Sequence, residues 1–210
     1  IATIADAIGN TTTYDYDTVT GRLLWKKNAL NQYIRYAYNN RGQVIHIWGD
    51  VQYPVEFDYD LFGQQTTMRT FRTNATWNGV TWPTEVTGEL TTWTFDDASG
   101  LITAKTDAAN KSVIYAYSID GKLTKRTWAR GTTTNYFYDV ATGELINIDY
   151  ENDTTNIAYT YNRLGQVMTI QDAAGTRSFL YNNTFDLVKE TITGIYSKEL
   201  NYTYTDTGMR

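Results

Sequence analysis

The chain repeats one short phrase, which is clearest in Tyr115-Ala116-Tyr117-Ser118-Ile119-Asp120-Gly121-Lys122-Leu123. The phrase consists of two aromatic residues two positions apart, a short polar turn that ends in glycine, and an aliphatic residue two positions later. It returns every 20–23 residues, apart from one gap of 36 residues. A fixed period of this length indicates a repeat architecture.

Nine aromatic pairs mark the units of this array. A spacing of i, i+2 places both rings on one face of a β-strand, where aromatic residues are favoured. We expect these rings to line one buried face of a sheet. The pairs are Tyr14/Tyr16, Tyr36/Tyr38, Phe57/Tyr59, Trp93/Phe95, Tyr115/Tyr117, Tyr136/Tyr138, Tyr159/Tyr161, Phe179/Tyr181 and Tyr202/Tyr204.

A glycine follows eight of the nine pairs, and the eighth copy has Phe185 in its place. Glycine adopts positive φ without steric cost, so the chain can reverse there and enter a second strand. Each unit is therefore predicted to be a β-hairpin, and nine hairpins predict about 17 or 18 strands. The predicted turn glycines are Gly21, Gly42, Gly63, Gly100, Gly121, Gly143, Gly165 and Gly208.

The phrase resembles the YD repeat of the RHS (rearrangement hotspot) family. Tyr16-Asp17 followed by Gly21-Arg22-Leu23 matches its pattern, residues 138–145 resemble its longer-turn form, and residues 161–167 resemble its shorter-turn form with Asn for Asp. The resemblance covers the chain except for about residues 70–90. It implies a fragment of a repeat array, in which tandem hairpins form one long, twisted antiparallel sheet that coils as part of a hollow shell around a polypeptide cargo.

Residues 1–210 are accordingly interpreted as one array of about nine repeats with an excursion near residues 70–90. In the excursion, Asn78-Gly79 between Trp77 and Val80-Thr81-Trp82 predicts a short hairpin. We expect Trp77 and Trp82 to pair across its strands. A binding loop is the alternative interpretation.

The composition excludes several functional classes. A net charge of −5 and a pI near 4.9 argue against nucleic acid and against anionic membrane surfaces as partners. There is no cysteine, which excludes disulfides and thiol chemistry. We find no signal peptide and no apolar segment long enough to insert into a membrane. The chain begins without Met and stops inside a repeat, so we expect it to be part of a longer protein.

The residues that could form a catalytic or metal site do not indicate one. His46 is the only histidine and lies in a predicted strand, which favours a structural role. Acidic residues at the spacing of a calcium loop occur in two places: Asp15 and Asp17, and Asp149, Glu151 and Asp153. The first pair falls on a repeat strand, and the second group falls at an inter-repeat turn. We predict no enzymatic activity, no catalytic or metal site and no cofactor.

The preferred hypothesis is a non-catalytic wall segment of a secreted, bacterial RHS-type shell that encapsulates or presents a C-terminal toxin-like polypeptide. Its partners would be flanking repeats and an enclosed polypeptide of the same parent chain. The alternative is a cell-surface repeat module that binds carbohydrate or protein through the aromatic rings. Edge strands are expected at residues 11–17 and 197–205, where edge-to-edge self-association could occur.

Overall fold

The computed structural model describes residues 1–51, 53–72, 78–82, 87–151 and 156–205. These residues form 18 β-strands and no helix, so they contain no helical segment that could cross a membrane. The all-β fold class and the strand number predicted from the repeats are thus confirmed. The chain divides into two compact units, Ile1–Ser112 and Val113–Arg210, which are described separately below.

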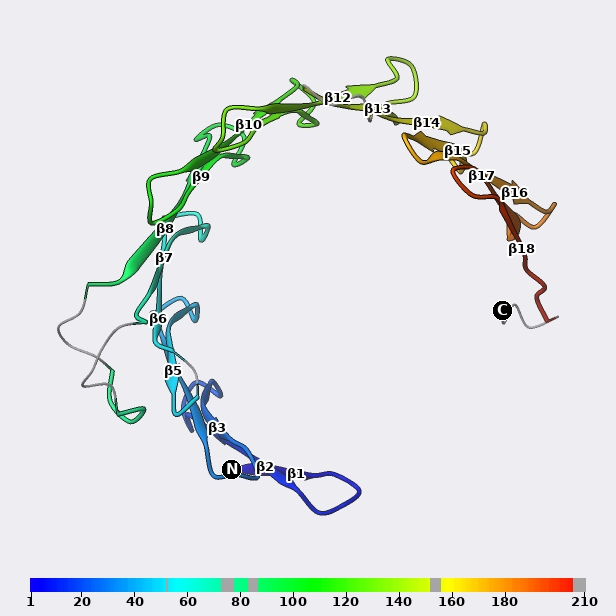
Figure 1. Ribbon diagram of the computed structural model, residues 1–210. Coiled ribbons are helices and arrows are strands. Elements are labelled where there is room, and N and C mark those ends of the chain that lie inside the picture. Colours follow the sequence, from blue (N-terminus) through cyan, green and yellow to red (C-terminus); the bar gives the residue numbers. More distant parts are fainter. Residues whose placement is uncertain (52, 73–77, 83–86, 152–155, 206–210) are drawn as a thin grey trace. The chain divides into compact units, whose positions relative to one another are not determined.

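The first unit is an antiparallel meander in which each strand pairs with the strand before it (Figure 1). Its strands are β1 (Ala2–Ala5), β2 (Thr11–Tyr16), β3 (Leu23–Lys27), β4 (Tyr33–Tyr38), β5 (Val44–Gly49), β6 (Val55–Tyr59), β7 (Gln65–Thr70), β8 (Glu89–Phe95) and β9 (Ile102–Thr106).

The second unit is built in the same way, and its first strand begins one residue before the boundary. Its strands are β10 (Ser112–Tyr117), β11 (Leu123–Thr127), β12 (Thr133–Tyr138), β13 (Leu145–Tyr150), β14 (Ile157–Tyr161), β15 (Val167–Asp172), β16 (Gly175–Tyr181), β17 (Leu187–Gly194) and β18 (Lys198–Asn201).

Eight hairpins carry the same register shift at the second aromatic residue. In the hairpin of β10 and β11, Ala116 lies opposite Lys125 while Tyr117 lies opposite Leu123, so Thr124 is an extra residue. Such a β-bulge increases local twist and re-aims the side chains around it. The bulge brings the second aromatic residue of the pair opposite the aliphatic residue that follows the turn glycine.

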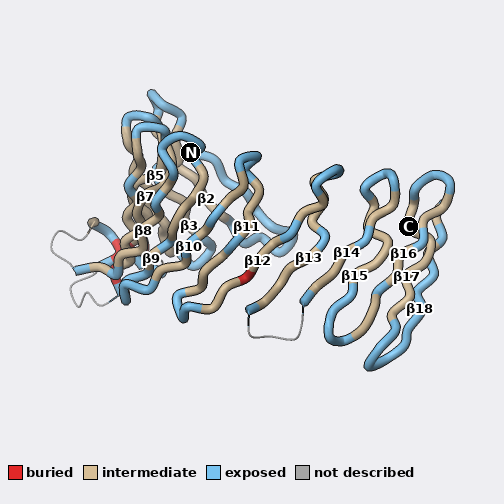
Figure 2. Tube along the Cα trace, turned by 90° about the horizontal axis from the view of Figure 1, so that it is seen from above, coloured by how far each residue is buried: buried red, intermediate tan, exposed pale blue. Residues whose placement is uncertain are grey.

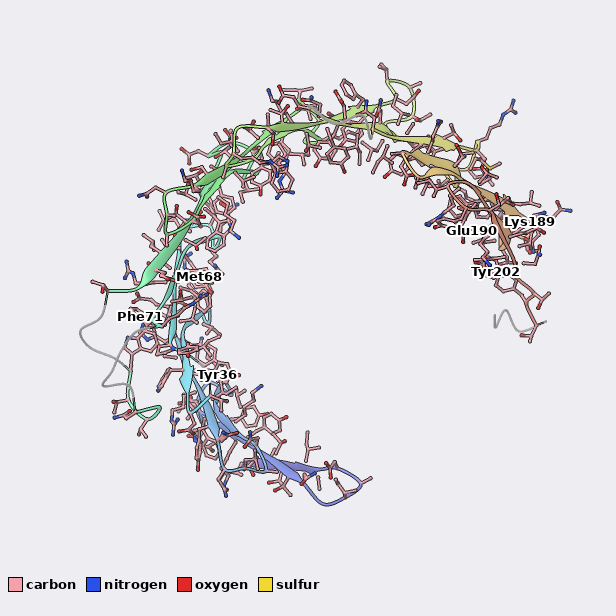
Figure 3. All side chains as sticks on the ribbon, in the orientation of Figure 1. Tyr36, Met68, Phe71, Lys189, Glu190 and Tyr202 are labelled. Carbon is pink, nitrogen blue, oxygen red and sulfur yellow. The ribbon has the colours of Figure 1, made fainter. Side chains whose placement is uncertain are left out.

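The paired aromatic residues share one face of the strands, and the residues between them lie on the other. In β10, Tyr115 and Tyr117 are partly buried, whereas Ile114 and Ala116 are exposed. The same alternation places Glu190 and Lys189 on opposite sides of β17, as Figure 3 shows.

The paired rings line one face, as expected, but that face is only partly buried. Seventeen of the 18 paired rings are partly buried, and Tyr16 is 41% exposed. Figure 2 shows partly buried strands, exposed turns and few buried positions. In each unit the described strands form a single layer, so neighbouring side chains on the same face cover the rings, and no second layer of described strands packs on them.

The predicted N-terminal edge also requires correction. Residues 11–16 form β2, which pairs with β1 on one side and β3 on the other. The first strand of the meander is instead β1, whose four residues are all exposed. At the other end, β18 is the last described strand of the second unit and its four residues are likewise exposed, which agrees with the expected edge at residues 197–205.

Candidate functional site: contacts that join one repeat to the next

Tyrosine hydroxyl groups link neighbouring hairpins. In six cases the second tyrosine of a pair donates a hydrogen bond to the backbone carbonyl of the aliphatic residue in the preceding hairpin, at distances of 2.7–2.9 Å. The donor and acceptor pairs are Tyr38 and Leu23, Tyr59 and Val44, Tyr138 and Leu123, Tyr161 and Leu145, Tyr181 and Val167, and Tyr204 and Leu187. We call these bonds the tyrosine ties.

The ties explain why the second aromatic position favours tyrosine over phenylalanine. The hydroxyl satisfies a carbonyl that lies 14–17 residues away in the sequence but in the adjacent hairpin. Burial raises the pKa of the Tyr38 and Tyr59 phenols, so the neutral donor form is favoured. Phe95 lacks a hydroxyl and cannot make this bond.

A second set of inter-repeat bonds comes from the residue directly after the turn glycine. The Nε2 atoms of Gln43, Gln64 and Gln166 donate to backbone carbonyls in the next turn, at 2.7–3.0 Å. Arg22 occupies the same position and donates to the carbonyl of Asn39 at 3.1 Å. Sequence analysis missed these residues, although the repeated Gly-Gln dipeptide was a signal for them.

Acidic turn residues bind the backbone of their own turn. In the longer turns, Asp17 and Asp139 accept N–H groups two and three residues ahead, and Asp96 accepts the N–H and hydroxyl of Ser99. These bonds lower the pKa of Asp17, with Thr20 as the main cause. The Ser or Thr before glycine in this turn was not singled out from the sequence.

Turn glycines adopt the left-handed conformation that these turns need. Seven of the eight predicted positions have φ between 70° and 90°, and Gly208 lies outside the described residues. Phe185 takes the same conformation with φ of 68° and donates its N–H to the carbonyl of Asn182 at 3.0 Å. The eighth turn therefore forms without glycine, at the cost of a strained backbone.

The described part of the excursion packs against the sheet. Trp82 stacks on His46 with ring centroids 3.9 Å apart and contacts Trp48 and Phe71 edge-on. Residues 78–82 contain no strand, and the rest of the predicted hairpin lies outside the described residues. Trp77, the expected partner of Trp82, lies outside the described residues.

His46 is held by structural contacts. Its Nε2 atom lies 3.5 Å from Glu56, whose other carboxylate oxygen is 2.9 Å from Arg69. The Trp48 indole donates to the carbonyl of Val80 at 3.1 Å. The unique histidine thus joins the sheet to the excursion.

Two of the candidate calcium ligands are engaged in other contacts. Asp17 binds its turn, and Glu151 accepts the N–H and hydroxyl of Thr133, both at 2.8 Å. Asp153 lies outside the described residues. Within the described ranges, no three acidic or histidine side chains gather as metal ligands would.

Comparisons with known proteins agree with this architecture. No protein-family model matches the chain. The chain is 27% identical over 158 residues to the tRNA3(Ser)-specific nuclease WapA of Bacillus spizizenii and to the tRNA nuclease WapA of Bacillus subtilis. Each match covers 64% of this chain but only 7% of the relative.

A solved structure has the same fold over nearly the whole chain. The crystal structure of TcdB2-TccC3 without its hypervariable C-terminal region covers 98% of this chain with a TM-score of 0.55 and 18% identity. This chain spans 14% of that protein's length. The tandem-hairpin fold expected from the resemblance to YD repeats is thereby confirmed.

Proposed function

We propose that this segment is a non-catalytic piece of wall in an RHS-type shell, with both units forming one continuous array. The observation that carries the proposal is the use of the repeated side chains. The second tyrosines and the glutamines after the turn glycines bind backbone groups of a neighbouring hairpin. The turn acids bind backbone groups of their own turn. A repeat whose polar side chains bind the next repeat is suited to extending a wall.

The turns of the second unit present a row of exposed apolar side chains. Ile119, Val140, Leu164 and Phe185 are each more than half exposed at successive turn tips. Apolar surface of this kind favours contact with further protein. In a longer parent chain, other repeats or the enclosed polypeptide would cover this row.

The cargo would be a C-terminal region of the same parent chain, in a secreted bacterial protein. Both WapA relatives come from bacteria and are named as nucleases, yet the chain matches only 7% of their length. We propose that any catalytic activity of the parent protein lies outside this segment. The paired aromatic residues and turn glycines have an architectural role in this proposal.

Protease protection in the intact parent protein tests the proposal. The region that follows the array should resist trypsin under native conditions and should be cleaved once the tyrosine ties are weakened by the triple substitution of Tyr138, Tyr161 and Tyr181 to Phe. The same triple substitution should leave any nuclease activity of the released region unchanged. Rapid cleavage of that region in the unsubstituted protein would contradict enclosure.

A binding module is the second candidate, and a cavity in the first unit favours it. The cavity lies between the turns of two neighbouring hairpins and contains aromatic rings beside polar groups. Apolar walls with a few polar groups are typical of ligand sites, and packing between repeats does not require such a cavity.

A further inference from the structure

The cavity lies where the tyrosine ties are interrupted. It has a volume of about 660 Å³ and lies between the turn of β6 and β7 and the turn of β8 and β9. At this junction Phe95 replaces tyrosine, and Gln65 replaces the aliphatic residue. Phe95 has no hydroxyl with which to make a tie, while Gln64 still bridges the two turns by donating to the carbonyl of Gly100 at 2.7 Å.

Aromatic rings form the apolar part of the lining. Trp93 and Phe95 come from β8, and Phe62, which is 82% exposed, comes from the opposite turn. Cavities of 300–1,000 Å³ with several aromatic walls are typical of ligand sites. The Trp93 ring already attracts a cation on the neighbouring strand, since the Lys105 ammonium lies 5.4 Å from its centroid.

Three carboxylates set the charge of the cavity. Asp60 and Asp96 each use the Oδ1 atom to bind their own turns, and in the described residues the Oδ2 atom of each has no hydrogen-bond partner. Asp97 is exposed and makes no hydrogen bond or ion pair with the described part of the chain. No lysine or arginine lines the cavity, but two cations adjoin it. The Arg41 guanidinium donates to the carbonyls of Asp60 and Leu61 at 3.3 and 2.6 Å, and Lys105 lies over the Trp93 ring. Asp96 and Asp97 form no ion pair with the described part of the chain.

We propose that this cavity binds the cationic side chain of a lysine or arginine in a polypeptide, with the ammonium or guanidinium group between the aromatic rings and the carboxylates. A neutral sugar would stack on the rings but would leave the carboxylates of Asp96 and Asp97 without a cationic partner in the described part of the chain. A cationic side chain matches both parts of the lining. The inference goes beyond the shell proposal and does not depend on it, because it concerns the 210-residue chain itself.

Binding of two matched tripeptides tests this proposal by NMR. Acetyl-Gly-Lys-Gly-amide carries the charge, and acetyl-Gly-norleucine-Gly-amide has a side chain of similar length without it. The lysine peptide should shift the Trp93 indole and the amides of Gly63 and Gly100 at millimolar concentration, and the shifts should weaken as salt is raised. The norleucine peptide should bind at least about threefold more weakly.

Two substitutions locate the site. Asp97→Asn should weaken the lysine peptide about threefold or more, whereas Asp149→Asn in the second unit, with the same change in net charge, should not. Phe95→Tyr should place a hydroxyl in the cavity and reduce binding without unfolding the chain. Equal binding of both peptides, shifts spread beyond the cavity, or shifts caused only by a neutral oligosaccharide such as cellotriose would each overturn the proposal.

Discussion

Removing one tyrosine hydroxyl measures what a tie contributes to the array. Tyr161 is partly buried and donates to the Leu145 carbonyl at 2.7 Å, the shortest of the six ties. A hydrogen bond of this kind contributes about 0.5–1.5 kcal/mol net, and leaving the carbonyl unsatisfied moves the cost toward the upper end. We expect Tyr161→Phe to lower the free energy of unfolding by about 1 kcal/mol, or the melting temperature by about 2–4 °C.

The matched control is Tyr136→Phe, which removes a hydroxyl that has no hydrogen-bond partner in the described part of the second unit. Its effect on stability should be within about 0.5 kcal/mol. The tyrosine ties join neighbouring hairpins, so removing several of them together should also lower the cooperativity of unfolding. The denaturant m-value should then be smaller. Equal losses for Tyr161→Phe and Tyr136→Phe in urea titrations would refute the assignment of the tie.

The other expected outcomes concern the turns, the excursion and pH. Phe185→Gly should relieve positive-φ strain and raise stability by about 1 kcal/mol in urea titrations, whereas Gly49→Ala should destabilise, since its Cβ would lie 2.0 Å from the Tyr33 carbonyl oxygen. Trp82→Ala should lower the free energy of unfolding by about 2–3 kcal/mol, somewhat less than the loss of a fully buried tryptophan. A loss under about 0.5 kcal/mol would mean that the excursion does not pack on the sheet. In melts across pH, turn acids such as Asp17 have a lowered folded pKa, so their contribution is present above about pH 4 and is lost as pH falls through that lowered pKa. Tied phenols such as Tyr38 have a raised folded pKa, so their contribution is present below about pH 10 and is lost as pH rises through the raised pKa; stability that keeps rising above pH 10 would contradict the donor role.

The hairpins were predictable because their signals are local. The i, i+2 aromatic spacing and the turn glycine lie within one hairpin, and they gave the strand number and the shared face correctly. The β-bulge was missed, since the extra residue, such as Thr124, is recognised only when both strands are aligned.

Contacts between repeats were harder to predict. The acceptor of Tyr161 is a backbone carbonyl 16 residues earlier, and a carbonyl carries no sequence signature. Trp82 could be matched to Trp77 by local pattern, but its partners are His46, in the distant strand β5, and Phe71, directly after β7. The N-terminal edge was misplaced because β1, which has no aromatic pair, still forms a strand and pairs with β2.

Electron cryomicroscopy of the intact parent protein tests the shell-wall proposal most directly. The proposal predicts that β1 and β18 pair with strands of flanking repeats, and that the array surrounds density for a polypeptide of the same chain. A map in which residues 1–210 stand as a separate module, with both end strands unpaired and no polypeptide enclosed, would contradict it.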